Sequence, residues 1–170
     1  NVLPIVDLGA DAAICDGVSY TLDAGNAGAS FIWSNGATDQ SISVSMSDTY
    51  TVTVTDANSC ENTDDFVLTV NSLPNVDLGA DQTICEGNSI NLDAVILGTY
   101  LWSTTETTQI ITVSTASNYA VTLTDMNGCV GSDDMDLTVN PLPVVDLGAD
   151  TTICQGNAIS LHAGSGWSYY

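Results

Sequence analysis

The sequence contains no lysine and no arginine, and its one histidine stands against 21 aspartates and glutamates, which gives a formal net charge of −21. A surface without cations has no clamp for phosphate groups and releases no counterions from a polyanion, which excludes DNA, RNA and anionic membranes as direct partners. No apolar run is long enough to span a bilayer, so direct membrane insertion is not predicted. We expect any signal peptide or anchor to lie outside these 170 residues.

Residues for catalysis are also scarce. The sequence has no lysine for Schiff-base chemistry, and the lone His162 falls at a predicted outward position of a strand, without a nucleophile beside it. The acidic pairs Asp64-Asp65 and Asp133-Asp134 could form a glycosidase couple, but adjacent residues of a strand face opposite sides. We therefore predict no catalytic residue and no enzyme activity.

One nine-residue string occurs three times in the sequence. The copies begin at Leu3, Leu73 and Leu142, and each ends in Val-Asp-Leu-Gly-Ala-Asp, followed four residues later by a cysteine. A spacing of 70 and then 69 residues predicts tandem small domains. We divide the chain into a first repeat (residues 1–70), a second repeat (71–139) and an incomplete third repeat (140–170).

The third repeat stops where the other two reach the tryptophan-containing segments at 31–33 and 100–102. A domain without its remaining strands cannot close its own core. We therefore expect the chain to be an excerpt of a longer repeat array, or else a subunit whose missing strands come from a neighbour. A unit of this size buries only about 60% of the surface that its unfolded chain exposes, so each repeat needs added stabilisation.

Five cysteines offer that stabilisation. Cys15 and Cys60 stand near the two ends of the first repeat, Cys85 and Cys129 occupy the matching places in the second, and Cys154 is left over. This regularity predicts one disulfide per repeat and an oxidising, extracytoplasmic compartment, with the partner of Cys154 beyond the sequence. Closing such a loop within each repeat would stabilise it by roughly 4 kcal/mol. The alternative is that the cysteines are unpaired buried thiols.

Short runs of strictly alternating apolar and polar residues fill each repeat, and no run has a helical period. Turn residues separate six or seven such runs, which predicts a small antiparallel β-sandwich in each repeat. In the first repeat the residues expected to face the core are Tyr20, Leu22, Ala24, Ile42, Val44, Tyr50, Val52 and Val54. The second repeat has apolar residues at the same phase, including Ile111, Val113, Tyr119, Val121 and Leu123.

The tryptophan segments are apolar on both faces. If Phe31 and Trp33 pack inside, as a central-strand tryptophan does in immunoglobulin-like domains, then Ile32 and its counterpart Leu101 point outward. A loop of the same domain could cover these two residues. Alternatively, Ile32 and Leu101 form a lateral contact between domains or chains.

Several motifs together carry a family resemblance. They are Val-Asp-Leu-Gly-Ala-Asp, Cys-x-Gly, Trp-Ser-x-Gly, Tyr-x-Val-Thr-Val-Thr-Asp and Asn-x-Cys, in this order. The chain resembles the immunoglobulin-like or PKD-like tandem repeats of large cell-surface adhesins and fibres in gliding Bacteroidota, exported by the type IX system. Two departures affect single positions: Trp-Ser-Thr-Thr replaces the glycine turn at 102–105, and His162 replaces the aspartate found at Asp23 and Asp93.

The resemblance implies an all-β fold of tandem immunoglobulin-like antiparallel sandwiches, about 70 residues each, outside the cell. Together with the composition, it predicts a structural repeat protein that forms a stalk or filament for adhesion. Its partners would be other copies of itself, neighbouring repeats or a surface polysaccharide. The alternative is a glycan- or protein-binding module of a secreted protein.

Calcium is a candidate ligand, although acidic turns of this kind are commonly only solvated. Ca²⁺ takes carboxylate, amide and carbonyl oxygens, and two equivalent turns are rich in them. The candidate ligands are Asp56, Asn58 and Asp64 in the first repeat and Asp125, Asn127 and Asp133 in the second. No other cofactor is indicated.

O-glycosylation is a second candidate modification. The tripeptide Asp150-Thr151-Thr152 resembles the short O-glycosylation signal of the same bacterial group, and Asp48-Thr49-Tyr50 is a looser match. The candidate sites are therefore Thr151 and Thr49. Short signals of this kind often occur by chance.

Overall fold

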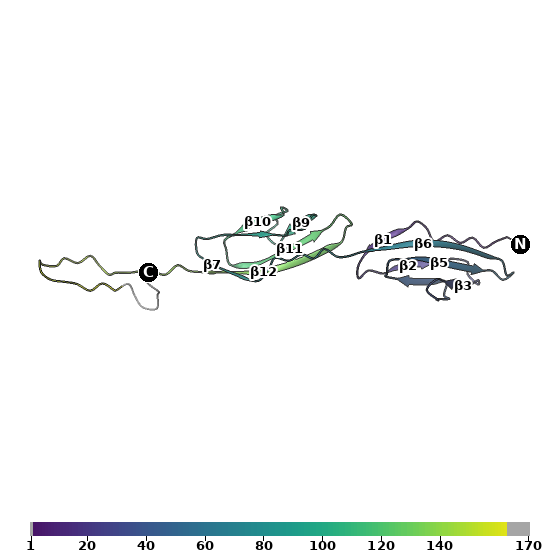
Figure 1. Cartoon of the computed structure of the whole chain (residues 1–170), viewed down its shortest axis with the longest axis horizontal. Coiled ribbons are helices and arrows are strands. Elements are labelled where there is room, and N and C mark those ends of the chain that lie inside the picture. Colours follow the sequence, from purple (N-terminus) through teal and green to yellow (C-terminus); the bar gives the residue numbers. More distant parts are fainter. Residues whose placement is uncertain (1, 163–170) are drawn as a thin grey trace.

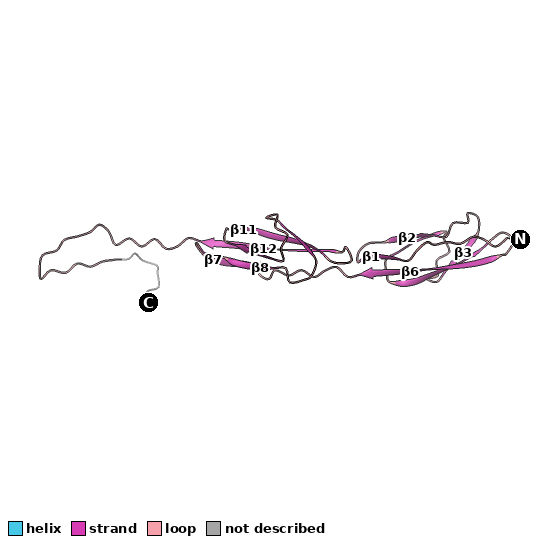
Figure 2. Ribbon diagram, turned by 90° about the horizontal axis from the view of Figure 1, so that it is seen from above, coloured by secondary structure: helices cyan, strands magenta, loops and turns pink. Residues whose placement is uncertain are grey.

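The computed structural model describes residues 2–162, and Figures 1 and 2 show two β-rich bodies arranged end to end. These residues form strands, turns and loops and no helix, so the described chain has no helix that could cross a membrane. The first repeat contains β1 (Ala12–Cys15), β2 (Tyr20–Asp23), β3 (Ser30–Trp33), β4 (Ser41–Val44), β5 (Asp48–Thr55) and β6 (Glu61–Asn71). The second contains β7 (Gln82–Cys85), β8 (Ile90–Asp93), β9 (Thr99–Trp102), β10 (Ile110–Val113), β11 (Ser117–Thr124) and β12 (Val130–Asn140).

Each repeat is built from two sheets. In the first repeat a four-stranded sheet has the order β1-β6-β5-β3, and β2 pairs with β4 in a second sheet. The second repeat reproduces this arrangement with β7-β12-β11-β9 and with β8 paired to β10. The predicted all-β fold of small immunoglobulin-like sandwiches is confirmed. One feature was not predicted: β1 runs parallel to β6, and β7 runs parallel to β12, while all other pairs are antiparallel.

The core of each repeat consists of the residues that alternate inward along the strands. Trp33 is 2% exposed and Val52 and Val54 are completely buried, while the serines and threonines between such residues face solvent or are only partly buried. The second repeat places Trp102, Val121 and Leu123 in the same way. Two separate cores result, one formed by residues 6–70 and the other by residues 76–139, so each repeat packs around its own tryptophan. The predicted phase of the strands is therefore confirmed.

The repeated string at residues 3–11 forms no strand, but hydrogen bonds through aspartate side chains hold it along the edge of β6. The main-chain N–H of Leu8 donates to Asp64 Oδ2 at 2.7 Å, and the N–H of Val67 donates to Asp11 Oδ1 at 2.9 Å. Between these bonds Gly9 has φ +84°, a conformation that suits glycine. The second repeat makes the equivalent bonds through Asp133 and Asp81. In both folded repeats the string thus serves as an edge segment.

The described part of the third repeat, residues 141–162, is exposed throughout and forms no strand. The strand that we predicted around His162, the copy of β2 and β8, is absent from the described residues. The segment corresponding to the tryptophan strand lies outside them. β2 and β8 are themselves paired with β4 and β10, and the described residues contain no third strand of that kind. A lone strand has no partner for its N–H and C=O groups, which accounts for the difference.

Candidate functional site: the junction between the repeats

A disulfide joins the two repeats to each other. Cys15 of the first repeat is bonded to Cys129 of the second, with Cα atoms 5.5 Å apart and a sequence separation of 114 residues. Cys60, Cys85 and Cys154 carry no disulfide in the described structure. The predicted pairing of Cys15 with Cys60 and of Cys85 with Cys129 within each repeat is therefore wrong.

The reason is the parallel pairing of the first and last strands. Cys15 ends β1 opposite Asn71, at the end of β6, whereas Cys60 immediately precedes β6 at its beginning. β6 has 11 residues. At about 3.3 Å per residue, the two cysteines of the first repeat stand on the order of 36 Å apart. A disulfide requires Cα atoms within about 7 Å of each other, so a bridge inside the repeat cannot form.

The same geometry brings Cys15 and Cys129 together across the junction. In Figure 2 the arrowhead of β6 points toward the second repeat, so Cys15 lies at the end of the first repeat that faces its neighbour. Cys129 immediately precedes β12, whose far end pairs with β7 at the opposite end of the second repeat. The loop cysteine of one repeat therefore meets the strand cysteine of the repeat before it.

A hydrogen-bonded turn holds Cys129 in place. Asp125 Oδ1 accepts the main-chain N–H of Asn127 at 2.9 Å and that of Cys129 at 2.8 Å. The N–H of Asp125 donates in turn to the carbonyl oxygen of Cys129 at 2.9 Å. Gly128 completes the turn at φ +80°. A closed loop thus presents the sulfur of Cys129 to Cys15, and Cys129 is completely buried at the junction.

The linker between the repeats also approaches the second repeat closely. A Cβ atom added at Gly131 would overlap the carbonyl oxygen of Pro74, so only glycine leaves room for the linker at this point. In the first repeat Asn62 stands at the equivalent position and its side-chain amide donates to the carbonyl oxygen of Pro4 at 3.0 Å. Both repeats therefore seat the Leu-Pro segment against the beginning of their last strand.

The candidate calcium ligands are engaged with the main chain instead of converging on a cavity. Asp64 and Asp133 accept the N–H groups of Leu8 and Leu78 as described above, and Asp56 and Asp125 each close a turn. Asn58 and Asn127 donate their main-chain N–H groups within the same turns. Among residues 2–162, no group of three or more histidine, cysteine, aspartate or glutamate side chains could hold a metal ion. Calcium binding at these six residues stays a prediction.

Two of the acidic side chains have perturbed acidity. The N–H of Cys60, which donates to Asp56, lowers the pKa of that carboxyl below its ordinary value of 3.8, and the N–H of Asn58 adds to the effect. The side-chain amide of Gln40 likewise lowers the pKa of Asp23. Both carboxyls are therefore ionised at neutral pH and serve as fixed acceptors in their turns.

The outward residues of the tryptophan strands are exposed. Ile32 is 64% exposed and Leu101 is 57% exposed, while Phe31 and Trp33 lie in the core. The outward orientation is confirmed, and cover by a loop of the same domain is ruled out by this exposure. A lateral contact through Ile32 and Leu101 stays a prediction.

The remaining candidate residues lie at the surface. Thr49 is exposed at the start of β5, and Thr151 is exposed and donates its hydroxyl to the carbonyl oxygen of Ala149 at 3.1 Å. Both hydroxyls are accessible to a glycosyltransferase, and glycosylation stays a prediction. His162 is also exposed, without the predicted strand around it.

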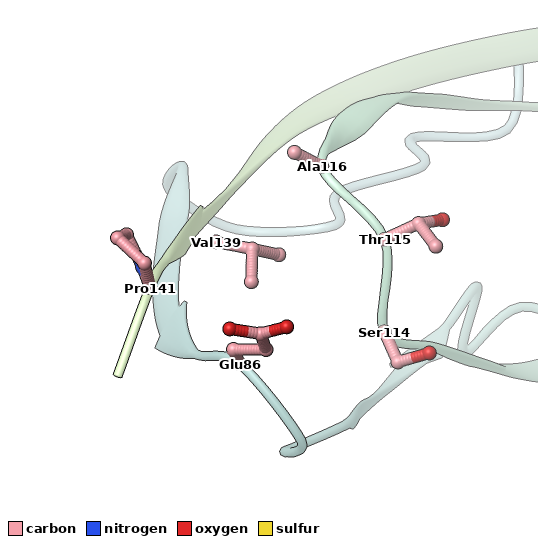
Figure 3. Close-up of a pocket in the computed structure, with 6 residues that line it drawn as sticks. All are labelled: Glu86, Ser114, Thr115, Ala116, Val139 and Pro141. Carbon is pink, nitrogen blue, oxygen red and sulfur yellow. The ribbon is translucent and has the colours of Figure 1, made fainter. Parts of the chain in front are cut away.

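An open pocket of about 400 Å³ lies at the end of the second repeat that is remote from the first. Figure 3 shows the Glu86 carboxylate pointing into it between Val139 and Ser114. Thr115, Ala116 and Pro141 complete the lining. Small hydroxyl and aliphatic groups dominate this pocket, and Glu86 directly follows Cys85 in the sequence. The pocket therefore belongs to the same end surface as an unpaired strand cysteine.

No protein-family model matches the chain, and no curated protein matches it. Among solved structures the chain is similar to the I-band fragment I67–I69 of titin, with 13% identity, 83% of this chain and 67% of that chain covered, and a TM-score of 0.48. It is also similar to the insect immune protein hemolin, with 14% identity, 82% of this chain and 46% of hemolin covered, and a TM-score of 0.46. A third similar structure is that of the N-terminal eight immunoglobulin domains of Down Syndrome Cell Adhesion Molecule, with 13% identity, 85% of this chain and 28% of that chain covered, and a TM-score of 0.37.

Proposed function

We propose that the chain is an extracellular structural repeat protein whose stacked sandwiches form a stiff stalk or filament for cell-surface adhesion. The observation that carries this proposal is the Cys15–Cys129 disulfide between consecutive repeats. Together with the peptide linker it gives the first and second repeats two covalent connections. A single linker leaves two domains free to rotate about it, whereas a second connection beside the linker restricts their bending and twisting.

The position of the second connection supports the stiffness. Cys129 is completely buried although it lies in a turn, and the linker at Pro74 is packed against Gly131. The turn that carries Cys129 is therefore closely packed at the end of the second repeat that bears the disulfide. Disulfides persist in oxidising compartments, which supports a place outside the cytoplasm.

The surface suits an extended array. The outward positions of the strands are mostly serine, threonine and aspartate, and the net charge of −21 makes neighbouring repeats repel one another. Repulsion of this kind opposes folding back of one repeat on another. Two of the similar structures are those of an immune protein with implications for homophilic adhesion and of a cell adhesion molecule. The role proposed for this chain belongs to the same broad class.

Small-angle X-ray scattering of the full chain tests the stiffness. We expect the wild-type protein to give one elongated particle, with the two folded repeats in line. Cys129→Ser should broaden the distance distribution, because the linker then becomes the only connection. Cys60→Ser is the matched control, since it removes the equivalent unpaired thiol, and it should leave the scattering unchanged. A wild-type profile as broad as that of Cys129→Ser would contradict the proposal.

A second candidate function is a glycan- or protein-binding module, and the exposed apolar pair favours it. Ile32 and Leu101 occupy equivalent positions of the two repeats and are more than half exposed. An apolar residue repeated on one face can contact a sugar ring, a protein or the side of another chain. Binding of the full chain to surface polysaccharides, compared with an Ile32→Ser/Leu101→Ser variant, tests this function. Equal binding by both would exclude this face.

A further inference from the structure

We propose that Cys60 and Cys85 are the two halves of a further junction of the same kind, so that disulfides link the repeats in series. Cys85 would bond the loop cysteine of a following repeat, as Cys15 bonds Cys129. Cys60 would bond the strand cysteine of a preceding repeat. The partner is a second copy of this repeat, in the same polypeptide or in another chain. The inference rests on the proposed function in taking the observed junction as the unit of assembly.

Cys85 has the backbone setting of the bonded Cys15. It ends β7 opposite Asn140, just as Cys15 ends β1 opposite Asn71, and both strands pair parallel to the last strand of their repeat. The next residue after each cysteine also makes the same hydrogen bond: the N–H of Asp16 donates to the carbonyl oxygen of Asn71, and that of Glu86 donates to that of Asn140, both at 2.8 Å. Both cysteine carbonyls also accept an N–H three residues later at 3.1 Å. Cys85 is therefore presented as a strand cysteine ready for a partner.

Cys60 has the setting of the bonded Cys129. Asp56 Oδ1 accepts the N–H of Cys60 at 2.8 Å, and Asp125 Oδ1 accepts the N–H of Cys129 at the same distance. The residue before each cysteine has a positive φ, 63° at Ser59 and 80° in the other turn. The turn that places Cys129 at the junction is thus already formed around Cys60, without a disulfide to impose it.

The bonded cysteines are more buried than their unbonded counterparts, as the proposal requires. Cys129 is completely buried, but Cys60 is only partly buried. Cys15 is partly buried, but Cys85 is exposed. The local folds agree, so the difference in burial comes from the neighbouring repeat and the disulfide. The unpaired thiols are open to a partner that would cover them in the same way.

The two thiols also lie at opposite ends of the double repeat. Cys85 ends β7, which Figure 1 shows at the end of the second repeat remote from the first. Cys60 precedes β6, which runs from the far end of the first repeat toward the second. They cannot reach each other within one pair of repeats. The open pocket beside Glu86 leaves the end surface next to Cys85 uncovered, as a seat for an incoming turn requires.

Charge explains why such a contact would need a covalent bond. Both ends belong to a chain with no lysine or arginine, so copies that approach end to end repel each other and form no ion pair with lysine or arginine. Salt screens this repulsion. A disulfide holds the ends together after the encounter, whatever the ionic strength.

The chemistry is thiol–disulfide exchange with a low-molecular-weight disulfide as the oxidant. The Cys85 thiolate attacks one sulfur of the oxidant, which gives a mixed disulfide and releases one small thiol. The thiolate of Cys60 from the partner then attacks the Cys85 sulfur and releases the second small thiol. Two protein thiols are oxidised by two electrons, and one oxidant molecule is reduced to two thiols.

The test uses the full chain carrying Cys154→Ser, which removes the remaining thiol. The protein is incubated with oxidised glutathione at high and low salt and separated without reductant. Cross-linked peptides are then identified after cleavage at acidic residues, because the chain has no site for trypsin. We expect a ladder of oligomers that is stronger at high salt. In it, Cys60–Cys85 links should exceed the sum of Cys60–Cys60 and Cys85–Cys85 links by about tenfold, which corresponds to a modest preference in docking free energy.

Two variants make the result specific. Cys60→Ser and Cys85→Ser should each abolish the ladder, and mixing the two variants should restore a Cys60–Cys85 dimer. Both retain the Cys15–Cys129 disulfide, which the same peptide map verifies. Glutathionylated monomers only, or Cys60–Cys85 links no more abundant than the sum of the other two kinds of link, as random pairing gives, would overturn the inference. The scattering test of a stiff double repeat would be unaffected by that failure, so the two proposals can fail separately.

Discussion

Opening the bridge between the repeats should destabilise both of them. Cys129→Ser removes the bond and replaces a completely buried sulfur with a hydroxyl of similar size. Cys15→Ser removes the same bond from the other side. Because one bond is lost in either case, the two variants and the double variant should have the same stability.

The magnitude follows from the loop that the bond closes. If the second repeat unfolds while the first stays folded, its chain is held at Asn71 by the linker and at Cys129 by the bond, because Cys15 pairs with Asn71. About 58 residues lie between these two points, and closing a loop of that length restricts the unfolded chain by roughly 4 kcal/mol at 25 °C. For a domain of this size, 1 kcal/mol corresponds to about 4–8 °C, so the melting temperature should fall by about 15–30 °C.

Calorimetry of the full chain measures this effect, and tryptophan fluorescence follows the repeats through Trp33 and Trp102, which are both buried in their cores. Cys60→Ser and Cys85→Ser are the matched controls, because they change equivalent positions that carry no bond. They should melt within a few degrees of the wild type. If Cys60→Ser lowered the melting temperature while Cys129→Ser did not, the bond between the repeats would be refuted and a bond within the first repeat favoured.

Four further predictions concern single features. Gly131→Ala should lower the denaturant midpoint by the equivalent of about 2 kcal/mol or more, because the new methyl group meets the linker carbonyl; an unchanged midpoint would show that the linker moves freely. Asp64→Ala should cost about 1–3 kcal/mol in urea unfolding, since an edge-segment N–H loses its acceptor, whereas alanine at the exposed neighbour Asp65 should cost less than 0.5 kcal/mol. The pKa of Asp56 is lowered in the folded state, so its contribution to stability is present above pH 3.8 and lost as the pH falls through the lower folded value; the midpoint should drop in that range, and less so in Asp56→Asn. Adding EDTA should leave the melting temperature unchanged, because the turn carboxylates already accept main-chain N–H groups, and a fall of several degrees would instead establish calcium as a ligand.

Local alternation was enough to predict the strands and their inward faces. Tyr50, Val52 and Val54 alternate with threonines, and a pleated strand necessarily sends such a set to one side. The two repeats also agree in phase along the last strand, where Phe66 and Met135 are buried and the residues after them are exposed. The outward position of Ile32 followed from the same rule.

The pairing of the cysteines could not be obtained in this way. In a tandem repeat, Cys15 stands at a regular spacing from both Cys60 and Cys129, so the sequence fits a bond inside a repeat and a bond between repeats equally well. The choice depends on the direction of β1 relative to β6, which is a long-range property of the sheet. Because β1 runs parallel to β6, a cysteine at the end of β1 and a cysteine just before β6 stand at opposite ends of the repeat.

The repeated string was also open to more than one interpretation. Asp64 and Asp133, which accept hydrogen bonds from the string, look like calcium ligands when only composition is considered. The structure uses Asp11 and Asp64 as acceptors for main-chain groups of an edge that has no ladder partner there. Which oxygen meets which N–H depends on the approach of segments about 56 residues apart, and no local pattern encodes that approach.

The bond between Cys15 and Cys129 also decides how the chain responds when it is pulled from its two ends. Tension entering at the first residues passes at Cys15 directly to Cys129 and leaves through β12, so it bypasses most of both sandwiches. The bypassed stretch spans 114 residues, roughly 400 Å of extended chain that mechanical load cannot draw out while the sulfur link holds. A tether built in this way would transmit a drag force with almost no lengthening, and would become extensible only under reducing conditions.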